Sequence, residues 1–387
     1  TYDKTFGKHD LNVLAGFMDE TRRADFTRGY RQNFLGTELH ELDLGDVSGQ
    51  QANGGAQKLI LRSWFGRLNY AFDSKYLFEA NLRHDGTSRF VGTNKWNSFP
   101  SFSAGWRMSQ EQFFQDSGLA NKISELKFRG GWGILGNQTT AGVGENAYPS
   151  ADNYYPGIFT ISSGYNYPIG SGLASGGAVA VAANPALLWE RSISSNIGMD
   201  LNFRNNWSFV VDYFNRVTDR LYMSLPVPVE FGLPSPVQNA GKVKNNGLEL
   251  QVNYANRSSE FKYDIGANVS YIKNQILEWK SNSAEPHSSF YVRDLGLPLR
   301  SFYGYETLGI YRSDEEYKNS GVIGVNNTVG AGDLIYKDQN GDGRIDGNDR
   351  VYLGSPDPKY IFGLTTNFAY KNFDLNMFWQ GAADVKG

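Results

Sequence analysis

The stretch FKYDIGANVSY, from Phe261 to Tyr271, carries the pattern that decides the fold of this chain. Every second residue from Phe261 onward is aromatic or aliphatic, and the residues between are polar or glycine. Because successive side chains of a β-strand point to opposite faces, the alternation predicts a strand with one apolar and one polar face. Eleven residues at about 3.3 Å each span roughly 36 Å, enough at a tilt of about 45° to cross most of a bilayer core.

The same period of two recurs along most of the chain, whereas helical periodicity is almost absent. Further examples cover residues 76–83, 197–204, 248–255 and 364–370. Counted by this alternation, the sequence predicts roughly eleven strands. We therefore expect an all-β fold in which antiparallel strands form a transmembrane β-barrel with long extracellular loops.

Two lengths of connection alternate between these strands. Short ones lie at Asp73–Lys75, Asn205–Asn206 and Ala255–Glu260, and long ones at Gly36–Gln57, Gln138–Pro185 and roughly Ser281–Pro358. Tight periplasmic turns and long outer loops are typical of outer-membrane barrels. The stretch from Ser163 to Ala183 is rich in Gly, Ser and Ala, and we expect it to be loosely packed and without chemistry.

Aromatic residues make up 14% of the chain and gather near the predicted strand ends. The clusters contain Trp64, Tyr70, Phe72, Tyr76, Trp96, Phe99, Trp106, Trp207, Phe209, Tyr213 and Phe214. Aromatic girdles at the two membrane interfaces would produce this distribution. The alternative is a soluble β-protein in which these aromatic residues form the core.

Composition excludes several classes of function. The 387 residues include 40 acidic and 37 basic ones, and this balance argues against a nucleic-acid partner. Cysteine is absent, so disulfides, thiolate metal sites and cysteine nucleophiles are excluded. The four histidines, His9, His40, His84 and His287, share no close spacing, so we expect no histidine-built zinc site. A mean hydropathy of −0.46 is compatible with a barrel, whose alternating residues average to a polar value.

The stretch DQNGDGRIDGND, residues 338–349, has the spacing of an EF-hand calcium loop although strand-like sequences flank it. The ligands at positions 1, 3, 5, 7, 9 and 12 would be Asp338, Asn340, Asp342, the backbone carbonyl of Arg344, Asp346 and Asp349, with Gly343 at the sharp turn. A solvated acidic turn is the alternative. We expect a structural Ca²⁺ in the extracellular segment 332–358, which has neither a base nor a nucleophile beside it for catalysis.

Other candidate sites are weaker. Asp200 and Asp212 fall on lumen-type positions, where a polar lining is favoured over a hydrolytic carboxylate pair. Trp189 and Glu190 are assigned to a girdle at a strand end. The pattern Gly130, Gly131 and Gly133 is followed by no helix, which rules out a phosphate loop.

Two further groups leave alternatives open. The basic residues Arg22, Arg23, Arg28 and Arg31 form a small cluster that lines the lumen or contacts lipopolysaccharide, with an ordinary solvated face as the default interpretation. The loop tyrosines Tyr154, Tyr155, Tyr165 and Tyr167 stack on sugar rings or pack within the loop. The sequence does not decide between these readings.

An ordered set of motifs resembles one family closely. The motifs are Ser88-Arg89-Phe90, NKWNSFPSFSAGWRMSQEQFF (94–114), LKFRGGWGILGNQ (126–138), NPALLWERSISSNIGMDL (184–201), NAGKVKNNGLELQV (239–252), YGYETLGIY (303–311), GDLIYKDQNGDGRIDGNDRVYLGSPDPKYIFGL (332–364) and DLNMFWQG (374–381). Together they resemble the SusC/RagA family of TonB-dependent outer-membrane transporters of Bacteroidetes. The resemblance covers nearly the whole chain.

The resemblance implies a large barrel in the bacterial outer membrane and no enzymatic activity. It also implies a SusD-like surface lipoprotein as partner, contact with outer-membrane lipid, and import of glycans or oligopeptides driven by TonB. Residues 1–387 would be a barrel portion without the plug domain, the N-terminal region that contacts TonB, or the final strands. The alternative function is a soluble, calcium-stabilised β-protein that binds or hydrolyses glycans at the cell surface.

Overall fold

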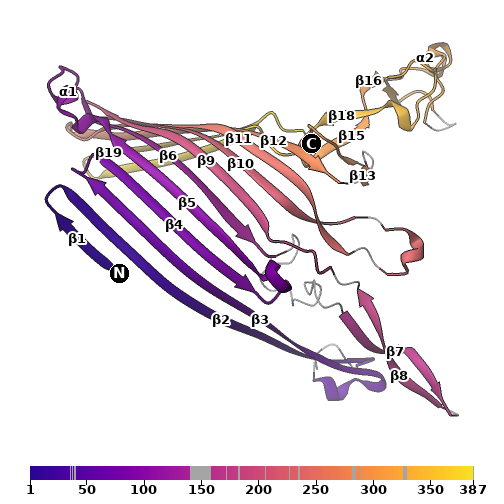
Figure 1. The fold of residues 1–387 in the computed structure, drawn as a ribbon. Helices are drawn as coiled ribbons and strands as arrows, with labels where there is room; N and C mark the ends of the chain where they lie inside the picture. The colour runs from indigo at the N-terminus through magenta and orange to yellow at the C-terminus, as the bar shows by residue number, and fades with distance from the viewer. Residues whose placement is uncertain are drawn as a thin grey trace.

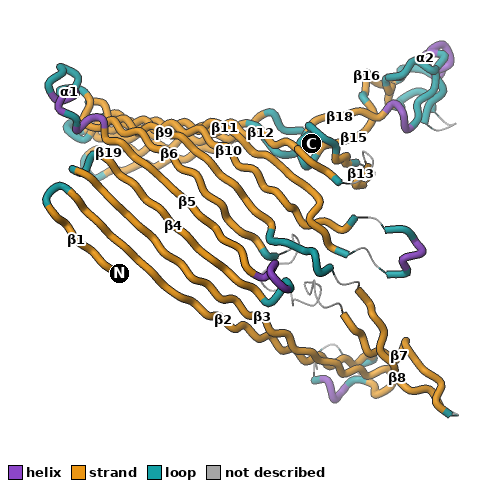
Figure 2. Tube along the Cα trace, in the orientation of Figure 1, coloured by secondary structure: helices purple, strands orange, loops and turns teal. Residues whose placement is uncertain are grey.

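The computed structural model describes residues 1–34, 36, 38, 41–139, 158–170, 172–181, 184–204, 206–225, 227–233, 236–280, 285–288, 290–325 and 329–386. Strands dominate these residues, and both α-helices are short (Figures 1 and 2). Across the described part of the chain, no helix is long and apolar enough to span a membrane.

Twelve strands, all but β1 at least eleven residues long, form one antiparallel sheet, which confirms the predicted all-β fold. In spatial order they are β1 (Tyr2–Phe6), β2 (His9–Gln32), β3 (Asp46–Phe72), β4 (Tyr76–Thr87), β5 (Trp96–Arg107), β6 (Ile123–Asn137), β9 (Glu190–Phe203), β10 (Trp207–Ser224), β11 (Val237–Asn256), β12 (Phe261–Trp279), β19 (Tyr360–Tyr370) and β20 (Phe373–Ala383). The sheet curves, so that its last strands pass behind the middle ones (Figure 1).

The remaining elements lie in the connections. They are the hairpin β7 (Ile158–Ile169) and β8 (Gly172–Val181), the small sheet β13 (Glu285–Ser288), β14 (Tyr291–Arg293), β15 (Ser301–Tyr305) and β18 (Arg350–Gly354), the pair β16 (Thr307–Ile310) and β17 (Leu334–Tyr336), and the helices α1 (Gln112–Gln115) and α2 (Asp314–Ser320). Short 3₁₀ turns complete the set at Leu42–Leu44, Gly92–Lys95, Met108–Gln110, Val229–Phe231 and Gly347–Asp349.

The two ends of the sheet differ in the way the sequence predicts. At one end, here called the short-turn end, the connections are residues 7–8, 73–75, 108–122, 204–206, 257–260 and 371–372. At the opposite end they include residues 138–189 and 280–359. By the rule for outer-membrane barrels, the short-turn end faces the periplasm and the other end faces outward.

Two expected loops are in fact strands. The second half of the loop expected at Gly36–Gln57, from Asp46 onward, belongs to β3, which pairs with β2 without interruption as far as Tyr30 and Gln51. The loosely packed stretch expected at Ser163–Ala183 contains most of the β7–β8 hairpin, whose turn holds Gly170 at a φ of 64°. Both ribbons extend beyond the main sheet (Figure 1), and strands outside the apolar band of a barrel have water on both faces. Their sequences therefore lack the alternation that marks a membrane strand.

The strand register separates an apolar outer face from a polar inner face. On β12, for example, Ile265, Ala267 and Val269 share one face with Tyr254, Val252 and Leu250 of β11. The opposite face carries Asp264, Gly266 and Asn268 beside Asn253 and Gln251. Since barrel strands in the outer membrane are apolar outside and polar inside, the first face meets lipid and the second lines the lumen.

Aromatic side chains form a belt on the outer face at the short-turn end. Ring contacts of 4.6–6.3 Å between centroids join Phe6 to His9, His9 to Phe72, Phe72 to Tyr76, Trp106 to Phe128, Trp207 to Tyr254, Tyr254 to Tyr263 and Phe261 to Phe368. We call these residues the short-turn belt. Its position confirms the girdle predicted from the clustering of aromatic residues.

A second, sparser aromatic belt lies further along the strands. Its pairs are Phe17 with Trp64, His84 with Trp96, Phe102 with Trp132 and Tyr271 with Tyr360. Phe72 and Trp64 of β3 are eight residues apart, about 26 Å along the strand and roughly 20 Å once tilted, close to the apolar band of such barrels. Between the two belts, the outward positions of β2 to β6, β9 to β12, β19 and β20 carry no Asp, Glu, Lys or Arg, whereas the short edge strand β1 places Lys4 there, opposite Leu11.

Two aromatic residues expected in girdles point elsewhere. Phe99 and Phe214 occupy inner-face positions of β5 and β10, because each lies an odd number of residues from the belt residues Trp106 and Trp207. Phe99 packs with Phe90, Leu187 and Trp189 in a small buried cluster at the outer end of the lumen. Clustering in the sequence located the strand ends, but the parity within each strand decides the face.

Several glycines lie directly opposite aromatic rings on the neighbouring strand. These cross-strand pairs are Gly16 with Phe65, Phe26 with Gly55, Gly86 with Trp96, Phe214 with Gly247 and Phe362 with Gly381. In each, a Cβ added at the glycine would overlap its aromatic ring. The ring thus covers glycine backbone that carries no side chain, an arrangement that stabilises sheets.

The pairing predicts unequal effects for two Gly→Ala substitutions on the inner face. Gly16→Ala should lower the free energy of unfolding by about 1–3 kcal/mol, because the new methyl group overlaps Phe65. Gly105→Ala is the matched control, since its methyl group would meet Leu77 at an ordinary 3.5 Å. Urea unfolding of the full-length protein in lipid vesicles measures both, and equal effects would contradict the pairing.

Candidate functional site

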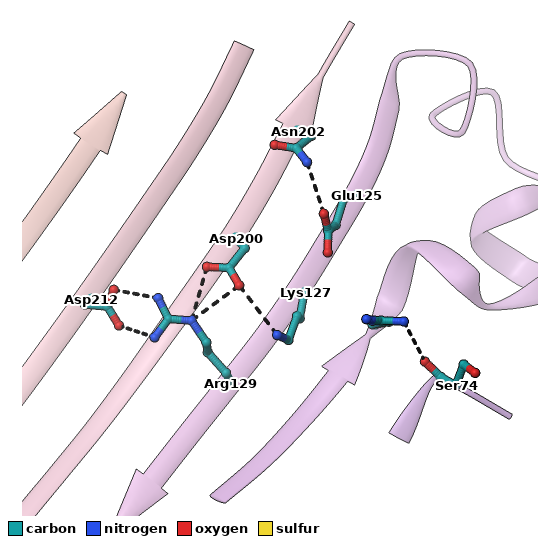
Figure 3. A network of polar contacts seen from close by, with 8 residues as sticks. Ser74, Glu125, Lys127, Arg129, Asp200, Asn202 and Asp212 are labelled. Atoms are coloured by element: carbon teal, nitrogen blue, oxygen red, sulfur yellow. Dashed lines mark hydrogen bonds and ion pairs between the residues drawn. The ribbon is translucent and has the colours of Figure 1, made fainter. Parts of the chain in front are cut away.

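A network of charged side chains crosses three strands on the inner face (Figure 3). The guanidinium of Arg129, on β6, donates from Nε to Asp200 Oδ1 at 3.1 Å and from Nη1 and Nη2 to Asp212 at 2.7 and 2.6 Å. Lys127 Nζ lies 3.9 Å from Asp200 Oδ2. Glu125 accepts a hydrogen bond from Asn202 at 3.0 Å on the same face. These groups place positively and negatively charged side chains next to one another on the inner face.

Gly198 makes the network possible. It lies opposite Arg129 on β6 and Asp212 on β10. A Cβ at this glycine would meet the Arg129 guanidinium at 2.7 Å and would also overlap the Asp212 carboxylate. The missing side chain therefore leaves room for one guanidinium to reach two carboxylates across β9. Bidentate Arg–carboxylate geometry fixes the side chains more firmly than a single contact would.

The structure brings Asp200 and Asp212 together, as a carboxylate pair would require, but it places Arg129 between them. All three side chains are 18–28% exposed, so they are partly shielded from solvent. This arrangement supports the polar lining that the sequence analysis favoured over a hydrolytic pair. Arg129 itself was missed, because pairs 71 and 83 residues apart in sequence become neighbours only once the strand register is known.

A hollow of about 630 Å³ opens on the inner face beside this network. Its lining combines charged and amide side chains, including Asp10, Asn69, Glu79, Lys127 and Arg129. Gly105 and Gly131 widen it, since no side chains fill the space at these two inner-face positions. The hollow can accept a polar group through hydrogen bonds and charge.

The outer end of the lumen is held by a set of side-chain to backbone hydrogen bonds. Asn239 of β11 accepts from the Leu188 amide at 2.8 Å and donates to the carbonyls of Leu188 and Arg220 at 3.0 and 2.8 Å. The Tyr222 hydroxyl accepts from the Glu190 amide at 3.1 Å and donates to the Asn137 carbonyl at 3.0 Å. These bonds fasten the returning end of the connection 138–189 to the barrel wall.

Trp189 belongs to this fastening rather than to a girdle, which corrects the assignment made from sequence. Its ring is 5% exposed and meets Phe90 and Phe99 edge-on, with centroids 5.6 and 5.3 Å away. Its Nε1 donates to the Lys95 carbonyl at 3.2 Å. The residue lies just before β9, outside the alternation of that strand, and packs against the inner-face residue Phe99.

The segment 338–349 adopts a tight loop within the long connection between β12 and β19. The carboxylate of Asp338 accepts hydrogen bonds from the amides of Gly341 and Gly343 at 2.6 and 2.8 Å. Gly343 has a φ of 79°, the left-handed conformation expected at position 6 of a calcium loop. Ile345, at position 8, is 6% exposed, and its amide donates to the Ile323 carbonyl at 2.9 Å.

The last carboxylate of the loop is the most enclosed. Asp349 is fully buried and accepts from the amides of Asp346 and Gln339 at 2.8 and 2.9 Å. The hydrogen bond from the Asp346 amide is the main reason why the pKa of Asp349 lies below its usual range. The side chain is thereby kept anionic and directed into the loop.

The oxygen chemistry of this loop suits a hard cation. Calcium is bound by carboxylate, amide and backbone carbonyl oxygens, and the predicted ligands supply only these. In the described residues, however, no three His, Asp or Glu side chains converge closely enough to define a metal centre. The carboxylates of Asp342 and Asp346 bond to the amides of Arg344 and Asn348 instead. The calcium site therefore stays a prediction.

The remaining candidates are dispersed by the fold. Arg22 and Arg28 share one face of β2 while Arg23 and Arg31 share the other, so the four do not form one patch. Arg23 pairs with Asp25 at 2.8 Å, and Arg31 donates to the Asp43 carbonyl at 3.2 Å. Gly130, Gly131 and Gly133 lie within β6, as expected for glycines that form no phosphate loop.

The loop tyrosines are only partly tested. Tyr154 and Tyr155 lie outside the described residues, and nothing is described of the Tyr165 side chain. Tyr167 lies on β7 and is 56% exposed. This exposure is compatible with both alternatives, stacking on sugar rings and packing within the loop.

Comparison with known families gives a match over nearly the whole chain. The family described as TonB dependent receptor-like, beta-barrel matches residues 2–385. TonB-dependent receptor P3 of Formosa agariphila is 30% identical over 99% of this chain and 38% of its own length. TonB-dependent receptor SusC of Bacteroides thetaiotaomicron is 29% identical over 97% of this chain and 36% of its own length.

Solved structures support the same fold. The RagAB peptide transporter aligns with a TM-score of 0.78 and 23% identity, covering 98% of this chain and 39% of the solved one. The chain thus spans less than two-fifths of the length of the proteins that it matches.

Proposed function

Because this chain belongs to the TonB-dependent receptor family, in its SusC/RagA-like branch and in the bacterial outer membrane, we propose that it forms part of the barrel wall of a nutrient importer. The observation that supports this most is the contrast between its two faces. From β2 to β20 the outer face carries no charged side chain between two aromatic belts, whereas the inner face carries the Arg129 network and a hollow of about 630 Å³. A wall of this kind separates lipid from a polar passage.

The soluble alternative does not account for the outer face. Residues such as Ile197, Leu248 and Phe362 are 47–69% exposed on the same side of the sheet. A water-soluble β-protein would cover such a continuous apolar face, whereas lipid covers it in a barrel. The proposed role is therefore transport, and the charged groups of the inner wall serve passage rather than catalysis.

The proposed cargo is a glycan or an oligopeptide, and the proposed partners are a SusD-like lipoprotein outside and TonB on the periplasmic side. RagAB is described as a peptide transporter, which supports the peptide class by analogy. The inner wall offers hydrogen-bond donors and acceptors of both charges, which suit the termini of a peptide as well as sugar hydroxyls. The long connections at the outer end provide a surface for the lipoprotein.

Uptake by cells tests the proposed importer. Cells that lack the full-length protein should lose uptake of either labelled oligopeptides or labelled oligosaccharides, and complementation should restore it. A protonophore should abolish the restored uptake, because TonB transmits energy from the inner membrane. Glucose uptake serves as the control for envelope integrity. Equal uptake with and without the protein, for both cargo classes, would contradict the proposal.

We also propose that the extracellular loop 338–349 binds Ca²⁺ as a structural ion. Asp338, Asn340, Asp342, Asp346, Asp349 and the Arg344 carbonyl would supply its oxygens. A bound cation would neutralise the clustered carboxylates and tie together a region whose described core is small. Support comes from the left-handed turn at Gly343 and from the buried anchor Ile345.

Calcium should stabilise the full-length protein through this loop. In the variant with both Asp338→Asn and Asp342→Asn, Ca²⁺ should no longer raise the thermal midpoint, because two of the anionic ligands are lost. The control Asp357→Asn removes an exposed carboxylate of the same region that pairs with Arg300, and should retain the response. Differential scanning fluorimetry with Ca²⁺ or EDTA provides the readout. An unsubstituted protein that is indifferent to both would rule the site out.

A further inference from the structure

Each connection at the short-turn end carries one basic side chain. Around the rim these are Lys8, Lys75, Lys122, Arg204, Arg257 and Lys371. Apart from Lys75, all are exposed, and the side chains of Lys8, Arg257 and Lys371 are 65%, 79% and 61% accessible. The same connections contain four acidic residues, Asp73, Glu111, Asp116 and Glu260, which leaves a net charge of +2. We call the six bases the basic ring.

The basic ring lies immediately beyond the short-turn belt. Lys8 separates the belt residues Phe6 and His9, and Lys75 precedes Tyr76. The Arg204 guanidinium carbon is 5.2 Å from the centroid of the Phe203 ring, and Lys371 Nζ is 5.2 Å from that of Tyr370. Aromatic belts mark the level of the lipid headgroups, so the charged ends of these side chains reach the depth of the phosphates.

Four of the six bases form ion pairs with acidic residues, and Arg257 pairs with Asp264 of β12 at 3.3 Å. Lys8 pairs with Asp73 at 2.9 Å and Lys371 with Glu260 at 3.7 Å, each joining one turn to the next pair of strands. Lys75 is 3.6 Å from Glu111, which also accepts hydrogen bonds from Tyr76 and Trp106 at 2.5 and 3.0 Å. The rim is thereby tied to the aromatic belt above it.

Lys122 and Arg204 are the two bases of the ring that are best placed to attract an anion. The Arg204 amide donates to the Lys122 carbonyl at 2.6 Å, so the two residues are neighbours. Within the described part of the chain, neither side chain forms an ion pair with an acidic residue. Two adjacent cations at headgroup depth attract an anion from the membrane surface.

We propose that the basic ring binds the phosphate groups of anionic phospholipids in the periplasmic leaflet of the outer membrane. The bases and the aromatic belt together match a headgroup that presents a phosphodiester at the edge of an apolar layer. The contacts fix the depth of the barrel in the membrane. This role is independent of the cargo, so its failure would leave the importer proposal untouched.

Lipid titration of the full-length protein tests the basic ring. The ring variant carries Lys8, Lys122, Arg204, Arg257 and Lys371 changed to Gln. The matched control changes five bases that face outward beyond the second belt, Arg23, Lys58, Arg62, Lys244 and Lys273, to Gln. Each protein, purified in dodecyl maltoside, is titrated with phosphatidylglycerol and followed by native mass spectrometry and thermal midpoint. Heat-dependent gel mobility confirms that each variant is folded.

The unsubstituted protein and the control should bind phosphatidylglycerol and gain several degrees, whereas the ring variant should bind at least tenfold more weakly. Raising the salt from 50 to 500 mM should weaken binding to the unsubstituted protein, because exposed charges are screened. Inorganic phosphate at the same concentration should have no effect. Equal lipid binding by ring and control variants, salt-independent binding, or equal protection by inorganic phosphate would each overturn the proposal.

Discussion

The structure depends on one constraint: backbone hydrogen bonds must be satisfied where no water is available. A sheet in lipid pairs every backbone group with a neighbouring strand, and its side chains then alternate between lipid and lumen. The ten inner strands of the sheet pair with a neighbour on both sides, and only β1 and β20 have one partner each among the described strands. The distribution of charge follows from the same rule, because charged residues occur on the inner face and beyond the belts, with Lys4 of the edge strand β1 as an exception. Two groups of charged residues show this distribution. The Arg129 network lies on the inner face, and the basic ring lies in the connections at the short-turn end.

How far the fold could be predicted depends on the surroundings of each strand. The alternation in Phe261–Tyr271 is visible because one face meets lipid and the other water, and β12 pairs as that pattern predicts. The outer halves of β2 and β3 meet water on both faces, so their sequence resembles a loop although they are strands. The same reason explains why the β7–β8 hairpin was not predicted.

Sites could be predicted only where their residues are close in sequence. The loop 338–349 is local, so its spacing alone proposes a ligand set. The Arg129 network joins β6, β9 and β10, and its register could not be read from any one of them. Trp189 shows the same limit, because its burial against Phe90 and Phe99 depends on how the chain enters the lumen. The contacts that could not be predicted are therefore mostly those between residues far apart in sequence, which depend on strand register.

The central claim is that one face of this sheet meets lipid and the other lines an aqueous lumen. Residues 1–387 contain no cysteine. With any cysteine elsewhere in the full-length protein replaced by Ser, single Cys substitutions from residue 261 to 271 can each be spin-labelled in liposomes. Electron paramagnetic resonance then measures collisions with oxygen, which dissolves in lipid, and with a water-soluble nickel chelate. The account predicts that odd positions such as Ala267 and Val269 favour oxygen and that even positions such as Asn268 favour nickel. Accessibility without a period of two, or nickel access at every position, would contradict it.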